Sequence, residues 1–248
     1  MKKAQKLSVC LLLIVVFSLS ASAQKMMMLD KGLKANSQPI EAKRKGVSTL
    51  SKYQFGPYKI VSGKTGWTTS KSKSKFFSFE TETESKKKSS FIFVADDKDS
   101  VLVNTATNTK VKETSIGNFS NLNKSSDNYI VLISPLNDTA EWKMLMFYNS
   151  GSEVEGNFKS DCTLTDGIVN INIQAIKQWE DGGTAAFKSI VGYEFYLENQ
   201  AIAAVQSSMT SSKKYIWLDQ NLSEHMKLVL AAASASLLLQ TDDQMAKL

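Results

Sequence analysis

The stretch LVLAAASASLLL, residues 228 to 239, decides the fold that the sequence predicts. Its only polar residues are Ser234 and Ser236, which are two positions apart and therefore do not share a face of a helix. A helix without a polar side must be enclosed, either by protein or by lipid. Twelve residues at about 1.5 Å each extend only ~18 Å, which is well short of the ~30 Å hydrocarbon core of a bilayer. The predicted surrounding is therefore protein.

The residues before this helix contain enough predicted strands to surround it. From Tyr53 onward, strand-like segments recur between polar clusters. The clearest is IVNINI, residues 168 to 173, which alternates apolar and polar side chains as a half-buried strand does. Residues 76 to 83 and 91 to 94 read as two strands of a hairpin, joined by a polar loop over residues 84 to 90.

We therefore expect a mainly β protein, an antiparallel barrel of roughly ten to twelve strands with the apolar C-terminal helix packed inside. Polar residues at the two ends of the segment NLSE, residues 221 to 224, predict a capping box at the start of this helix. The alternative fold is a lipocalin-like barrel or a sandwich with the helix outside. That arrangement would require a polar stripe on the helix, which the sequence lacks.

The N-terminus is typical of a secretory signal peptide over residues 1 to 23. Lysines at positions 2, 3 and 6 precede an apolar run over residues 7 to 19, and Ala21-Ser22-Ala23 forms a cleavage site. We expect cleavage after Ala23 and a secreted or periplasmic protein; the alternative is an uncleaved membrane anchor. Residues 24 to 50 show neither structural period and are predicted to be a flexible leader. Residues 51 to 248 then form a single β-rich domain.

Charge and cysteine content narrow the function. The chain has 30 Lys and Arg against 24 Asp and Glu, a net charge of +6. Removing the three lysines of the signal peptide leaves 27 − 24 = +3, which is no footprint of nucleic-acid binding. Cys10 would leave with the signal peptide, so Cys162 cannot form an intramolecular disulfide. We expect Cys162 to be a small buried residue on a strand.

The residues needed for common catalytic chemistries are scarce. His225 is the only histidine and lies at the start of the predicted helix, where we expect a polar end group rather than a base. One histidine and one remaining cysteine are too few for an ordinary zinc site. We therefore predict a protein that is not an enzyme and needs no cofactor. The alternative is a carboxylate-dependent hydrolase, because paired carboxylates need not be adjacent in sequence.

Two basic segments flank the strand predicted over residues 76 to 83. Both are expected at strand ends, at one rim of the barrel, where they could contact anionic lipid headgroups or acidic polysaccharide. Solvated loops that discourage edge-to-edge aggregation are the alternative interpretation. The candidate surface-binding residues of this rim are Lys71, Lys73, Lys75, Lys86, Lys87 and Lys88.

The order of elements at the C-terminus resembles a known superfamily. A hairpin over residues 192 to 205 is followed by a strand over residues 215 to 218 and then by the apolar helix. This order is similar to the ending of the tubby C-terminal-like superfamily, which includes the phospholipid scramblases and the LURP-one-related proteins. The resemblance implies a closed barrel of about twelve strands around a hydrophobic C-terminal helix. It carries no functional residue to this chain, and members of that superfamily act inside cells, whereas we expect this chain to be exported.

The sequence favours an exported, non-catalytic β-barrel with a binding or structural role at the cell envelope. An envelope protein that binds lipid or a membrane surface is the alternative, and a hydrolase is the second alternative. The partner is unknown; envelope lipid or another envelope protein is expected rather than nucleic acid. If the helix fills the barrel, binding must use the rims and loops.

Overall fold

The computed structural model describes residues 25–45, 52–74, 80–96, 98–116, 119–136, 140–151, 162–184, 189–209, 211 and 213–245. The predicted signal peptide lies outside these residues. The helices and strands in chain order are α2 (Lys31–Asn36), β1 (Ile40–Lys45), β2 (Lys52–Phe55), β3 (Tyr58–Thr65), β4 (Thr69–Ser74), β5 (Glu80–Ala95), β6 (Asp99–Ile116), β7 (Phe119–Pro135), β8 (Trp142–Gly151), β9 (Cys162–Thr165), β10 (Asn170–Ile176), β11 (Gly192–Leu197), β12 (Gln200–Gln206), β13 (Lys214–Leu218) and α3 (Glu224–Met245).

The strands form one antiparallel sheet that closes on itself. Its order is β3-β2-β1-β13-β12-β11-β10-β9-β8-β7-β6-β5-β4, and β3 also pairs with β5. That pairing joins twelve strands into a barrel and leaves β4 as one extra strand. Closure pairs β3, which would otherwise be an exposed edge, with β5, and β4 remains as an edge strand. The predicted mainly β barrel is confirmed.

The C-terminal helix α3 fills the barrel, as the sequence predicted. Every residue from 228 to 241 is buried, and the helix shares one core with inward side chains of the strands, among them Phe93, Val103 and Phe195. The six Leu and Val side chains between residues 228 and 239 contribute about 9–18 kcal/mol at ~1.5–3 kcal/mol each. Such burial on all sides rules out the alternative with the helix outside.

The start of α3 differs from the predicted capping box. The hydroxyl of Ser223, rather than the side chain of Asn221, accepts a hydrogen bond from the backbone N–H of Met226, at 3.2 Å. The amide of Asn221 instead donates to the carboxylate of Asp219, at 3.0 Å. Asn221 therefore bonds to Asp219, and Ser223 caps the helix in its place.

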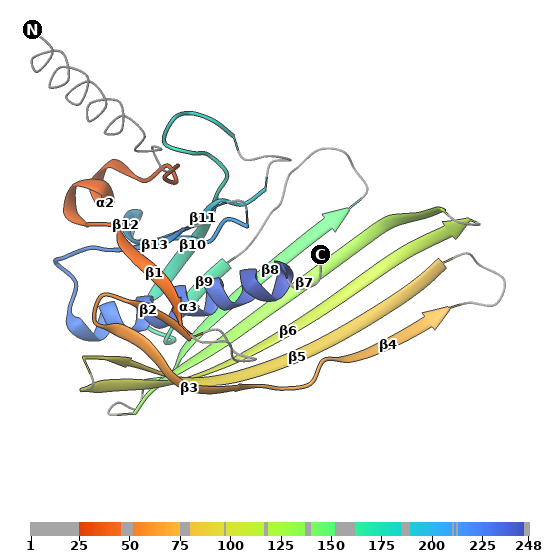
Figure 1. Cartoon of the computed structure of the whole chain (residues 1–248), viewed down its shortest axis with the longest axis horizontal. Helices are drawn as coiled ribbons and strands as arrows, with labels where there is room; N and C mark the ends of the chain where they lie inside the picture. The colour runs from red at the N-terminus through yellow and green to blue at the C-terminus, as the bar shows by residue number, and fades with distance from the viewer. Residues whose placement is uncertain are drawn as a thin grey trace, which may run out of the picture.

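Residues 84 to 90 are not the predicted hairpin loop. They lie in the middle of β5, which is one continuous strand of 16 residues. Its second half pairs with β3 and its first half with β4, while β6 runs along its whole length. Figure 1 shows β4 to β8 running past the end of α3 and away from the barrel. Because this projecting part covers no core, its side chains need not alternate, and the sequence lacks a strand signal there.

The predicted flexible leader needs correction for residues 25 to 45. Residues 25 to 36 lie across the outside of the barrel, where Met27 and Leu33 share a small second core with Trp179 and Trp217. The side chain of Gln206, which is fully buried, accepts a hydrogen bond from the backbone N–H of Met27 at 2.8 Å. β1 then joins the barrel between β13 and β2. Short apolar anchors and strand pairing hold this segment, although it has no regular hydrophobic period.

Candidate binding surface

The structure does not gather the six predicted rim lysines at one rim. Lys75 lies outside the described residues. Lys71 and Lys73 lie on β4, and Lys86, Lys87 and Lys88 lie in the middle of β5 rather than at a strand end. Since side chains alternate along a strand, Lys86 and Lys88 point outward while Lys87 points inward. The ammonium of Lys87 donates to the carboxylate of Asp243 on α3, at 2.6 Å.

The outward lysines of β4 belong to a ladder of alternating charges. Lys71 is directly opposite Glu84, which is directly opposite Lys110, and Lys73 is directly opposite Glu82. The hydrogen bond from Lys86, with Lys110 also nearby, holds the pKa of Glu84 below its usual range. Opposite charges facing each other across strands stabilise the projecting sheet. These carboxylates therefore have a structural role, and Lys71 and Lys73 are compensated.

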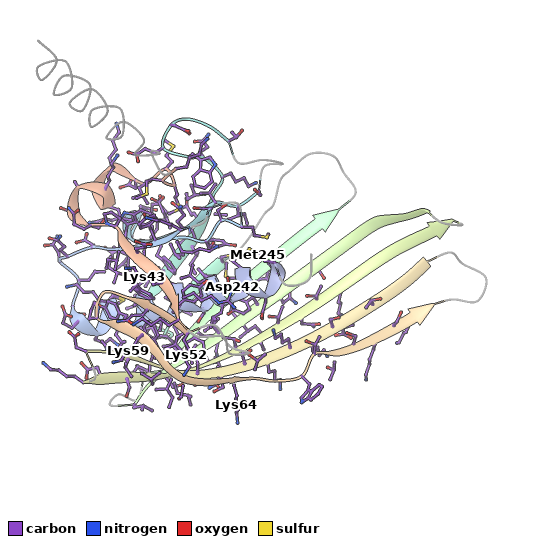
Figure 2. The ribbon with its side chains drawn as sticks, in the orientation of Figure 1. Lys43, Lys52, Lys59, Lys64, Asp242 and Met245 are labelled. Carbon is purple, nitrogen blue, oxygen red and sulfur yellow. The ribbon has the colours of Figure 1, made fainter. Side chains whose placement is uncertain are left out.

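Lysines from four strands form a basic surface that includes Lys86 and Lys88 of the predicted rim. It covers the outside of β1, β2 and β3 and the adjoining part of β5, and we call it the basic face. Figure 2 labels four of its members along β1 to β3. The basic face consists of Lys43, Lys45, Lys52, Lys59, Lys64, Lys86 and Lys88.

The pairing register concentrates positive charge on the basic face. Lys45 is directly opposite Lys52, and Lys43 and Lys59 are both opposite Gln54. Within β1, β2 and β3, which are described over their whole length, the only acidic residue is Glu41, 4.0 Å from Lys213. Like charges directly across strands are destabilising. The pair of Lys45 and Lys52 thus costs stability, although Lys52 also donates to the carbonyl of Val61, and Lys86 is paired with Glu84.

An exposed tryptophan lies beside the basic face. Trp67 is in the short connection between β3 and β4 and is 94% exposed, whereas Trp142, Trp179 and Trp217 are all buried. Full exposure of the largest apolar side chain is unfavourable in water, and its indole is suited to the boundary between water and lipid. Trp67 therefore adds an exposed apolar side chain beside the positive charge.

Polar groups in the second half of α3 form hydrogen bonds with the barrel wall. The hydroxyl of Tyr53 donates to both carboxylate oxygens of Asp242, at 3.0 and 2.9 Å, and that of Tyr129 donates to the carbonyl of Ser236 at 2.9 Å. Burial, reinforced by Asp242, raises the pKa of Tyr53 well above its usual value, so this hydroxyl stays a donor. Figure 2 shows Asp242 near the C-terminal end of the helix. These groups anchor the helix.

The buried lysine Lys214 has a similar structural role at the end of β13. Its ammonium donates to the backbone carbonyls of Ser207 and Ser208, at 3.2 and 2.8 Å. Burial lowers the pKa of Lys214, and the carboxylate of Asp242 opposes that shift. The carbonyls and the carboxylate together compensate the charge, so this lysine fixes the chain between β12 and β13.

A hollow of about 1010 Å³ lies outside β9 to β11 beneath the N-terminal segment. Its buried carboxylate, Glu194, is 2% exposed. Glu194 accepts hydrogen bonds from the backbone N–H of Asp30 and the hydroxyl of Tyr196, both at 2.6 Å. Burial, followed by this hydrogen bond, raises the pKa of Tyr196 above its usual value. Glu194 therefore ties residues 25 to 36 to the barrel.

The other residues singled out for chemistry do not form a site. Cys162 is buried on β9 within the main core, as predicted, and His225 is exposed in the first turn of α3. Among the described residues, no group of three or more His, Cys, Asp and Glu side chains could hold a metal ion. No described helix is long and apolar enough to cross a bilayer. The described structure thus gives no positive indication of catalysis.

Comparisons of the chain with known proteins found no relative. No family model, no curated protein and no solved structure matches the chain. The function must therefore be inferred from the surface described above.

Proposed function

We propose that this protein is an exported, non-catalytic barrel that binds anionic membrane surfaces from the envelope side through its basic face. The observation that carries the proposal is the concentration of lysines on β1 to β3 with one carboxylate among them. The helix inside the barrel directs binding to the outside, because the interior is occupied. The export signal and the resemblance to the tubby C-terminal-like superfamily remain predictions.

Charge alone gives this face a useful affinity. Lys43, Lys45, Lys64 and Lys88 are exposed. At about 1 kcal/mol for each lysine near an anionic surface, the four supply about 4 kcal/mol, roughly a thousandfold enrichment at low salt. Since the Debye length falls from ~10 Å at 0.1 M salt to ~3 Å at 1 M, this attraction is screened by added salt. Trp67 adds an apolar contact that salt does not screen.

Liposome flotation tests the proposal. We expect the protein to float with phosphatidylglycerol vesicles at low salt, to remain behind with phosphatidylcholine vesicles, and to lose binding as salt is raised. The triple variant Lys43→Gln, Lys45→Gln and Lys64→Gln should bind about a hundredfold more weakly, since it loses ~3 kcal/mol of attraction.

The matched control changes the same number of charges on another face. Lys25, Lys31 and Lys34 lie in the N-terminal segment outside the basic face, and Lys25 and Lys34 form ion pairs with Asp181 and Glu180. Their replacement by Gln should leave flotation nearly unchanged. Equal binding to both vesicle types, or equal losses in the two triple variants, would contradict the proposal.

A further inference from the structure

A pocket opens where the barrel wall is interrupted, between the end of β3 and the start of β4. Both strands pair with β5: Thr65 of β3 is opposite Ser89, and Thr69 of β4 is opposite Lys86. The connection of residues 66 to 68 departs from regular pairing here, and Gly66 donates its N–H to the carbonyl of Lys88 at 2.7 Å. The outer surface is therefore hollowed at this junction, with a pocket of about 430 Å³.

The lining of this pocket has an apolar part and a basic part. The outward side chains of Ala106 on β6 and of Ile130 and Leu132 on β7 supply the apolar part, and Ile130 remains 38% exposed. Lys64 on β3 and Lys88 on β5 supply the basic part, and both are exposed. The described lining contains no acidic residue.

The register shows how these two parts adjoin. Lys88 is directly opposite Ala106, which is directly opposite Ile130, so the three form one row across β5, β6 and β7. Lys64 is opposite Ser90, two positions from Lys88 on the same face, which places both lysines at one end of that row. A ligand lying along the row would meet positive charge at one end and hydrocarbon at the other.

We propose that this pocket binds an anionic amphiphile, with its phosphate or carboxylate between Lys64 and Lys88 and its alkyl chain over Ala106, Ile130 and Leu132. The volume falls within the roughly 300–1,000 Å³ of small-molecule sites. Binding would cover apolar surface that the fold leaves in water and would give two lysines a counter-charge. The site shares Lys64 and Lys88 with the basic face, and to that extent it rests on the proposed function.

Dodecyl phosphate below its micelle concentration is a suitable probe, with binding to the full chain measured by titration calorimetry. We expect saturable binding of one molecule per chain. Ala106→Phe should abolish it by filling the apolar part, and Lys64→Gln combined with Lys88→Gln should weaken it about 10- to 30-fold, at ~1 kcal/mol per lysine. The control double variant Lys31→Gln and Lys34→Gln should bind as the wild type does.

A second variant, Ile130→Glu, guards against misfolding of Ala106→Phe, because Ile130 is an exposed outward position that places a carboxylate beside the alkyl chain. Both variants should keep the wild-type circular dichroism spectrum and lose binding. Absence of saturable binding to the wild type, or unchanged binding by both variants, would overturn the inference.

Vesicles distinguish the source of the ligand and separate this site from the basic face. Displacement of dodecyl phosphate by phosphatidylglycerol vesicles would support the site with a bilayer lipid as its source; retention would support it with a free amphiphile as its source. Saturable binding by a chain that fails to float with anionic vesicles would support the pocket and reject the proposed function. Flotation without saturable binding would reject the pocket alone.

Discussion

Two serines in the middle of α3 allow a matched test of the enclosed helix. The hydroxyl of Ser234 is buried and has no hydrogen-bond partner. The hydroxyl of Ser236, also buried, donates to the carbonyl of Ala232 at 2.9 Å. Replacing each serine by alanine removes the same atom from the same helix, but only Ser234→Ala removes an unsatisfied polar group. We expect Ser234→Ala to stabilise the protein and Ser236→Ala to leave it nearly unchanged.

The sizes of the two effects follow from their surroundings. Both variants gain ~0.5 kcal/mol from the higher helix propensity of alanine. Ser236→Ala loses a hydrogen bond of about 0.5–1.5 kcal/mol, which cancels or slightly exceeds that gain. Ser234→Ala instead relieves a desolvation penalty of roughly 1–3 kcal/mol. The free energies of unfolding of the two variants should therefore differ by about 3 kcal/mol, a difference of roughly 6–12 °C in Tm at ~2–4 °C per kcal/mol.

Urea unfolding followed by the fluorescence of the buried tryptophans measures this difference. The midpoint should rise for Ser234→Ala at an unchanged slope, because the surface exposed on unfolding is the same. A Ser234→Ala protein no more stable than Ser236→Ala would refute the reasoning, since it would mean that Ser234 meets water or a partner and that α3 is not enclosed at that position.

Three further predictions test how the outer segments are held. Gly192→Ala should destabilise the protein by several kcal/mol in urea unfolding, because an added Cβ would lie 2.2 Å from the carbonyl oxygen of Val205 and 2.4 Å from the sulfur of Met27; an unchanged midpoint would contradict that packing. Glu194→Ala should leave the N–H of Asp30 without its acceptor and expose residues 25 to 36 to trypsin, whereas cleavage there at the wild-type rate would show that Glu194 does not hold the segment. Asp166→Asn should lower the urea midpoint at neutral pH, because hydrogen bonds from the N–H groups of Val169 and Ile168 hold the pKa of the Asp166 carboxyl below its usual range. This stabilisation is present above the unfolded pKa of about 3.9 and is lost as the pH falls through the folded pKa. A difference between the two proteins that persists at pH ~2 would argue against this explanation.

The barrel with its central helix was predictable because one segment restricts the choice of fold. Residues 228 to 239 offer no polar stripe, so the helix had to be surrounded, and the strand-like segments before it were numerous enough to do so. Turns were also recognisable, as at Asp166-Gly167, where Gly167 has a φ of +95° that favours glycine. The apolar composition of the helix and the residue types of a turn can both be seen directly in the sequence.

The projecting sheet was not predictable from periodicity. Residues 84 to 90 are polar on both faces because neither face of the sheet covers a core there, so alternation is absent. What holds these residues in a strand is pairing between strands, such as Lys71 opposite Glu84 and the hydroxyls of Ser70 and Ser85 at 2.9 Å. Those partners are fixed only when the long strands align.

The part of the basic face on β1 to β3 was missed for a related reason. Lys43 lies in a basic run, Lys43-Arg44-Lys45, but in a segment interpreted as a leader, and Lys52 and Lys59 are single lysines on two short strands. The pairing of β2 with both β1 and β3 places these strands side by side and turns these lysines to one surface. The lysine runs that attracted attention, at residues 71 to 75 and 86 to 88, are partly compensated by Glu82, Glu84 and Asp243. The pairing register of the strands therefore locates the basic face better than runs of lysine in the sequence do.

The most direct test of membrane binding by the basic face is the fluorescence of Trp67, since the other three tryptophans are buried. With phosphatidylglycerol vesicles at low salt, we predict a blue shift of the emission and reduced quenching by acrylamide, both absent in Trp67→Phe and absent with phosphatidylcholine. Emission and quenching of the wild type that stay unchanged with anionic vesicles would contradict the account.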